Sequence, residues 1–250
     1  MKKSLLIITI SLIFAGCSAS VDTANMTSTE RLQYAISLFN EETYDLAIAE
    51  FESILLQFPG SEVIDDAQYY LANSRFKRKE FIMAAFEYSR LIKNMPASEF
   101  VIEAQYQLAE TYYQLSPDYT LDQRYTKKSI EEFQAFIDFF PTDARVPEAE
   151  TKITELNNKL AQKEFTSAVI YEKLEYYTAA VKYYTNVTEI YHDTDFAPKA
   201  SFNKIKLLLK REKFNDASKE LNLYLSKYPQ DSGYSDALKI RDELAKKNLL

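Results

Sequence analysis

One histidine and one cysteine are the side chains of this 250-residue chain best suited to nucleophilic, acid–base or metal chemistry. His192 stands beside Asp193 and Asp195, a combination that can hold a metal or move a proton. A histidine dyad or poly-histidine centre needs a second histidine, and one cysteine forms neither an internal disulfide nor a cysteine-rich zinc site. Three glycines are too few for a phosphate-binding loop. We therefore expect a protein that is not an enzyme and that has no metal or cofactor.

Cys17 lies at the end of an N-terminal targeting segment. It follows two lysines and an apolar run over Leu5–Ala15. At about 1.5 Å per residue, a helix of that length covers about half of a hydrocarbon core of roughly 30 Å, so residues 1–16 are predicted to be a signal peptide. Residues 13–17, Ile-Phe-Ala-Gly-Cys, resemble a bacterial lipobox. This resemblance implies cleavage after Gly16 and a covalent lipid on Cys17; the alternative is an ordinary secretory signal with an incidental cysteine.

The lipobox resemblance also implies a location. Ser18 follows Cys17, and in lipoproteins of diderm bacteria a non-acidic residue there indicates the outer membrane. Several acyl chains, at about 0.8 kcal/mol per buried methylene, hold a protein stably on a bilayer. We expect an outer-membrane protein that is anchored through its lipid and faces the periplasm, with residues 17–28 as the lipidated tether.

The remaining chain is an internal repeat whose first two copies match at an offset of 37 residues. Its template is a small residue, an aromatic residue or Leu four positions later, Pro after eight more, and Ala after another eight. The five copies are Ala47, Phe51, Pro59 and Ala67; Ala84, Tyr88, Pro96 and Ala104; Ser129, Phe133, Pro141 and Ala149; Ala180, Tyr184, His192 and Ala200; and Ala217, Leu221, Pro229 and Ala237.

This template predicts helix pairs. Residues i and i+4 share a helix face, where the small residue admits a neighbouring helix and the aromatic residue fills the space beside it. Pro ends the helix, and the next Ala lies in the following one. The spacing resembles tetratricopeptide repeats. We therefore predict an all-α fold, an α-solenoid of about five tetratricopeptide-like helix pairs whose stacked neighbours share a core.

Two insertions divide the array. A turn-rich stretch over 116–122 lengthens repeat three, and the stretch 147–171 lacks Gly and has Pro only at its start, which favours one long helix. The predicted domains are residues 29–146, with repeats one to three, and residues 147–250, with the long linking helix and repeats four and five.

The order of lipobox, five repeats, loop and long helix resembles the BamD family of outer-membrane lipoproteins in the β-barrel assembly machinery. Local motifs at 122–126, 160–164 and 177–180 resemble segments of that family. The resemblance implies that N-terminal repeats receive signals of unfolded outer-membrane barrel proteins. It also implies that C-terminal repeats dock a POTRA-containing insertase, and that other assembly lipoproteins are further partners. Tyr183 stands where members of the family can carry Arg. The ion pair that such an Arg could form with the partner is therefore not expected in this chain.

Two sets of residues follow as binding candidates. First helices line the concave groove of tetratricopeptide arrays, and tyrosines suit a peptide there, although packing between repeats is the competing explanation. A basic cluster over 199–213 is either a partner interface or a solvated face. The groove candidates are Thr29, Leu32, Ile36, Tyr69, Asn73, Lys77, Tyr106, Glu110, Tyr113 and Gln114; the interface candidates are Tyr183, Lys199, Lys204 and Lys206.

Charge restricts the possible partners. The formal net charge is −7, with the acidic excess in the N-terminal half, so we expect no nucleic-acid binding.

The rival function is a lipidated tetratricopeptide adaptor that coordinates cell-wall synthesis or division complexes. The Tol–Pal coordinator type usually has a coiled coil before its repeats, whereas this chain starts its first repeat about twelve residues after Cys17.

Overall fold

The computed structural model describes residues 22–248, which form eleven α-helices and no strand. The signal peptide, Cys17 and the first part of the tether lie outside these residues. The helices are α1 (Ser28–Asn40), α2 (Tyr44–Gln57), α3 (Ile64–Lys77), α4 (Phe81–Asn94), α5 (Val101–Leu115), α6 (Arg124–Phe139), α7 (Val146–Lys173), α8 (Tyr177–Ile190), α9 (Ala197–Lys210), α10 (Phe214–Lys227) and α11 (Tyr234–Lys246).

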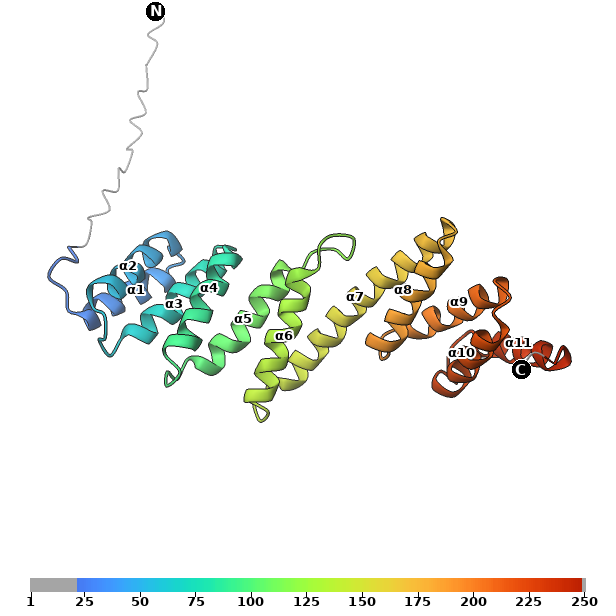
Figure 1. Ribbon diagram of the computed structural model, residues 1–250. Helices are drawn as coiled ribbons and strands as arrows, with labels where there is room; N and C mark the ends of the chain where they lie inside the picture. The colour runs from blue at the N-terminus through green and yellow to red at the C-terminus, as the bar shows by residue number, and fades with distance from the viewer. Residues whose placement is uncertain (1–21, 249–250) are drawn as a thin grey trace, which may run out of the picture.

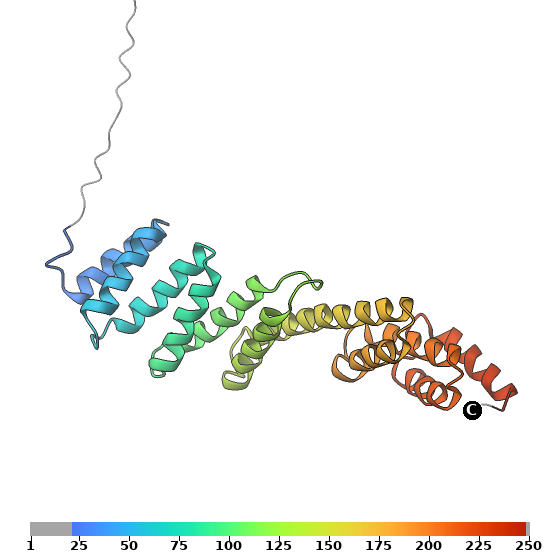
Figure 2. The same ribbon diagram turned by 45° about the horizontal axis from the view of Figure 1, so that its top comes forward.

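The helices form one elongated row with α1 and α11 at opposite ends (Figures 1 and 2). Each helix packs mainly on its neighbours in sequence, and first helices also meet across repeats, as α1 meets α3 and α7 meets α9. Five pairs, α1–α2 to α9–α10, are followed by α11. The predicted all-α solenoid of about five helix pairs is confirmed.

Small and aromatic template residues make the contacts between helices. Ala47 and Phe51 of α2 are fully buried, in a core shared by α1, α2 and α3. The corresponding pairs are buried in every other repeat: Ala84 and Tyr88, Ser129 and Phe133, Ala180 and Tyr184, and Ala217 and Leu221. A side chain much larger than Ala or Ser at the first position would push the paired helices apart, which is why a small residue recurs.

Proline and its substitute mark the helix ends. In four repeats the second helix ends two residues before Pro, as α2 ends at Gln57 before Pro59. In repeat four, α8 ends two residues before His192, which is exposed. Pro147 and Pro198 instead lie in the first turns of α7 and α9, where a backbone N–H would have no acceptor within the helix, so its absence costs no hydrogen bond. The long helix α7 continues for 28 residues and places a single element between repeats three and four.

A polar contact recurs in the same register of the repeats. In four of the five pairs, an acidic side chain three residues after the small template residue accepts a hydrogen bond from the preceding first helix. We call this contact the polar clasp. Its four examples are Arg31–Glu50 at 2.7 Å, Gln68–Glu87 at 2.7 Å, Gln105–Glu132 at 2.8 Å and Ser201–Glu220 at 2.6 Å.

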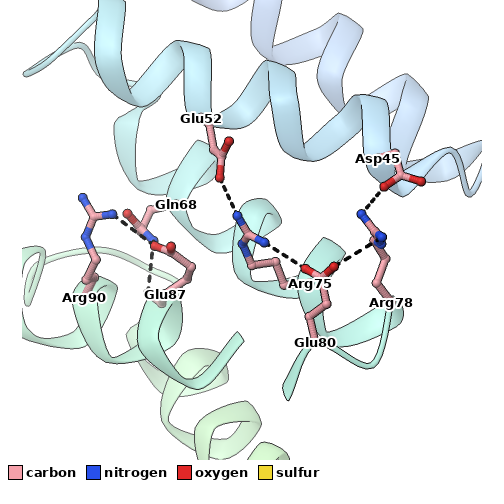
Figure 3. A network of polar contacts seen from close by, with 8 residues as sticks. All are labelled: Asp45, Glu52, Gln68, Arg75, Arg78, Glu80, Glu87 and Arg90. Carbon is pink, nitrogen blue, oxygen red and sulfur yellow. Dashed lines mark hydrogen bonds and ion pairs between the residues drawn. The ribbon is translucent and has the colours of Figure 1, made fainter. Parts of the chain in front are cut away.

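Ion pairs connect repeats one and two on the surface (Figure 3). Arg75 of α3 contacts Glu52 of α2 at 2.5 Å and Glu80, in the turn before α4, at 2.8 Å. Arg78 bridges the same Glu80, at 3.3 Å, to Asp45 of α2. The side chain of Arg75 is 14% exposed and that of Glu52 is 50% exposed, so the network is partly buried at its centre and exposed at its edge. The exposed contacts contribute little individually.

None of the helices within residues 22–248 combines the length and the hydropathy that a membrane span requires.

Candidate protein-binding surfaces

Two of the predicted groove residues belong to the core, and their assignment to a groove is wrong. Leu32 is 4% exposed and packs in the core shared by α1, α2 and α3. Tyr106 is 6% exposed, and its ring meets Phe133 and Phe136 of α6 edge-on. The repeat register places both residues on first helices, as predicted, but Leu32 packs into the core among α1, α2 and α3, and Tyr106 packs on α6.

Three further groove candidates are half-buried and take part in packing. Tyr69 stacks on Phe100 with 4.4 Å between ring centroids, and Ile36 packs against the first core. The amide oxygen of Asn73 accepts a hydrogen bond of 2.6 Å from the hydroxyl of Tyr88. These contacts give the three side chains a structural role and leave only their outer edges open to a ligand.

The exposed groove candidates are Thr29, Lys77 and Gln114, one on each of α1, α3 and α5. Thr29 lies in the first turn of α1, whereas Lys77 and Gln114 lie in the last turns of α3 and α5, so the exposed candidates stand at opposite ends of the first helices. Peptide binding at these residues stays a prediction.

Glu110 and Tyr113 face α7 rather than an open groove. Glu110 forms an ion pair with Lys152 of α7, and the Tyr113 hydroxyl donates to Glu155 at 2.8 Å. Burial opposes the charge on Lys152, but its acidic partners Glu110 and Glu148 outweigh burial and raise its pKa. Burial of the Tyr106 hydroxyl raises its pKa to about 12. The carboxylate of Glu110 is therefore occupied by the long helix.

The polar clasp is reversed in repeat four. Glu164 of α7 stands at the donor position and Tyr183 of α8 at the acidic position. Glu164 accepts a hydrogen bond of 3.0 Å from Asn186, while Tyr183 stacks on Tyr171 with 5.1 Å between centroids. Burial, with the nearby Tyr171 and Glu164, raises the pKa of Tyr183. Tyr183 thus presents a half-buried aromatic surface where the other repeats have a carboxylate.

Only some residues of the predicted basic interface lie on one surface. Lys199, Lys206 and Lys210 are exposed at a spacing that places them along one side of α9. Lys199 and Lys206 lie over the rings of Phe196 and Phe202, at 4.9 and 5.0 Å. Lys204 instead forms an ion pair of 2.9 Å with Glu220 of α10 and is 14% exposed at its side chain. Lys204 therefore belongs to the contact between α9 and α10.

A pocket that the repeat pattern did not predict lies in the C-terminal repeats. Its volume is about 860 Å³, and it opens between the turn joining α7 to α8 and the end of α9. Three tyrosines, Val181 and Leu208 form much of its lining, with cations around them. The aromatic and cationic lining residues are Tyr171, Tyr176, Tyr177, Lys182, Arg211 and Lys213.

No group of three His, Cys, Asp or Glu side chains arranged to hold a metal ion occurs in the part of the chain that the structure describes. His192 is exposed in the turn after α8, where it occupies the place of the repeat's Pro. The features that the described residues do offer are exposed positions on the first helices, a row of cations on α9 and the tyrosine-lined pocket, all of which suit contacts with proteins.

These helix pairs and surfaces define a tetratricopeptide-like α-solenoid, a class that works by binding other proteins. Residues 24–206 match the family YfiO, described as outer membrane lipoprotein, and the chain belongs to this family. A relative from Rickettsia prowazekii (strain Madrid E), named outer membrane protein assembly factor BamD, is 26% identical over 236 residues, 94% of each chain. The predicted resemblance to the BamD family is confirmed, and the family supports an outer-membrane lipoprotein involved in assembly.

Solved tetratricopeptide structures also resemble the chain. The TPR2AB domain of yeast Sti1, solved as a complex with pHSP90, is 15% identical and has a TM-score of 0.43, covering 88% of this chain and 86% of its own. The tetratricopeptide protein TTC0263 of Thermus thermophilus is 18% identical with a TM-score of 0.37, covering 90% and 100%. Their superposition is loose, and the fold assignment rests on the helix pairs of this chain.

Proposed function

We propose that this protein is a non-enzymatic scaffold of outer-membrane β-barrel assembly. Its N-terminal repeats bind signals in unfolded barrel proteins, and its C-terminal repeats dock a POTRA-containing insertase, with other assembly lipoproteins as further partners. The observation that supports this proposal is the likeness along 94% of the chain to a relative named as an outer membrane protein assembly factor. A solenoid suits the role because each repeat adds binding surface along the row.

The proposal assigns a surface to each role. Thr29, Lys77 and Gln114 remain open for a barrel-protein segment along α1, α3 and α5. Lys199 and Lys206 on α9, with Tyr183 on α8, are the candidates for the insertase. A covalent lipid on Cys17 would hold the chain at the periplasmic face of the outer membrane, where both partners meet.

Depletion of the protein in its own cells tests this role. Folded porins, detected by their heat-modifiable migration, should fall while lipoproteins without barrels persist. Re-expression of the full chain should restore the porins, which separates the effect from general stress. Unchanged folded porins together with a defect confined to cell separation would contradict the proposal and favour a cell-wall or division adaptor.

A further inference from the structure

The pocket in the C-terminal repeats lies in a repeat where the repeat pattern changes at the end of the first helix. In repeats one and two, an aromatic residue near the end of the first helix meets the first aromatic of the second helix edge-on. The ring centroids lie 5.6 Å apart for Phe39 and Tyr44 and 5.3 Å apart for Phe76 and Phe81. These contacts close the turn between the two helices with apolar surface.

Repeat four has a carboxylate at this closing position. Glu172 stands where Phe39 and Phe76 stand, and it accepts a hydrogen bond of 2.8 Å from the Tyr184 hydroxyl. Repeat five closes the same position with Leu209, which packs on the core beside Phe214. Tyr177 lines the pocket, whereas Glu172 points to Tyr184 and is not among the lining residues.

The pocket combines aromatic walls with a cationic rim. Tyr171 and Tyr176 meet edge-on at 6.3 Å, and Arg211 and Lys210 lie over the ring of Tyr177 at 4.8 and 5.2 Å. Cations held over aromatic rings remain available to an anion on their other side. Lys182 and Lys213 add positive charge, and Glu175 is the one carboxylate among the lining residues.

Exposed apolar side chains continue from the pocket mouth. Ile170 and Leu174, one helical turn apart at the end of α7, are 51% and 58% exposed, and Tyr176 is 63% exposed. A volume of about 860 Å³ lies within the usual range of roughly 300–1,000 Å³ for ligand sites and accommodates a few side chains. A partner with apolar anchors and negative charge matches both features.

We propose that this pocket binds an extended acidic peptide segment of a partner protein. An aromatic or aliphatic side chain of the peptide enters between Tyr171, Tyr176 and Tyr177, and its carboxylates face Arg211, Lys213 and Lys182. This site goes beyond the proposed scaffold role, because it takes an extended segment rather than a folded domain. Its test is independent of barrel assembly.

Fluorescence anisotropy with the mature full chain in detergent tests the site. The probe is a labelled, N-acetylated peptide, Gly-Asp-Glu-Phe-Asp-Phe-Gly, and the comparison peptide carries Lys at each acidic position. The acidic peptide should bind at least about tenfold more tightly than the Lys peptide. This difference in affinity should shrink at about 1 M salt, where charges are screened over a distance of roughly 3 Å. Equal affinities for the two peptides would overturn the proposal.

Charge reversal locates the binding within the molecule. Arg211→Glu should weaken binding of the acidic peptide about tenfold, whereas Lys219→Glu, an exposed cation of α10 outside the pocket, should change it by less than about twofold. Thr178→Trp, an exposed lining position, should block the pocket and abolish binding with the helical circular dichroism unchanged. Equal effects of the two reversals would overturn the proposal. The proposal would also be overturned if the chain bound phosphatidylglycerol vesicles instead of the peptide and Arg211→Glu abolished that vesicle binding.

Discussion

Gln68 shows at the residue scale why the polar clasp recurs. Its amide nitrogen donates to the backbone carbonyl and to the carboxylate of Glu87, at 3.1 and 2.7 Å, and the side chain is fully buried. A buried carboxylate that loses its donor keeps the cost of leaving water. The clasp therefore ties α3 to α4 with a contact that tolerates little change.

Gln68→Ala should lower the free energy of unfolding by about 1–2 kcal/mol, because a charge-assisted hydrogen bond is lost while Glu87 stays buried, with Arg90 at 3.2 Å as its remaining side-chain partner. Urea unfolding followed by circular dichroism measures the loss. Gln33→Ala, on the exposed side of α1, is the matched control and should change stability by less than about 0.5 kcal/mol. Equal losses in the two variants would show that the clasp is not stabilising.

Cys17 carries a prediction about the anchor, and it lies outside the described residues. Cys17→Ala should move the protein from the membrane fraction to the soluble periplasmic fraction, because the lipobox resemblance assigns the membrane contact to the lipid. Fractionation with immunoblotting measures this. Cys17→Ala protein that stays in washed membranes would remove the argument for a lipid anchor.

At the scale of the element, α2 depends on a small residue at its contact with neighbouring helices. Ala47 has no exposed surface, whereas Ala49, two residues further along the same helix, is exposed. Ala47→Leu should destabilise the protein by roughly 1–3 kcal/mol through overpacking, and Ala49→Leu should leave stability nearly unchanged. Thermal unfolding of both variants provides the comparison, and an unchanged Tm for Ala47→Leu would contradict the assigned contact.

The turn before α7 carries a pH-dependent contact. Asp143 accepts hydrogen bonds from the Arg145 side chain and backbone N–H, both at 2.9 Å, and these bonds lower its pKa to about 2. A lowered pKa contributes stability that is complete above the unfolded value of about 3.9 and is lost as pH falls toward about 2. Asp143→Asn should reduce this acid sensitivity of the unfolding midpoint, while Asp138→Asn, on the exposed side of α6, should not. Identical acid profiles in the two variants would contradict the contact.

The helices could be predicted from the sequence because their causes are local. Small, aromatic and Pro positions define each pair, and they are buried or lie just past helix ends as expected. The direction of side chains on first helices is not fixed by the period, so Leu32 and Tyr106 were wrongly assigned to a groove. The pocket escaped prediction because its lining combines the end of α7, the start of α8 and the end of α9, a relation between repeats rather than a motif.

At the scale of the whole molecule, the row separates two kinds of surface. The first helices of repeats one to three and the cations of α9 lie at different points along its length, with α7 between them (Figure 2). Under the proposed function, a partner on one surface would leave the other free for a second partner. Such geometry suits a scaffold, and the central claim of the proposed role is that the C-terminal repeats dock a POTRA-containing insertase.

Site-specific photo-crosslinking in living cells tests that claim most directly. A crosslinking residue at Tyr183 should give an adduct with a POTRA-containing barrel protein, identified by mass spectrometry after affinity purification from membranes. The same residue at Gln33, on the exposed side of α1, is the matched control and should not give that adduct. Adducts from Tyr183 with cell-wall synthesis or division proteins, and none with a barrel protein, would contradict the assembly role.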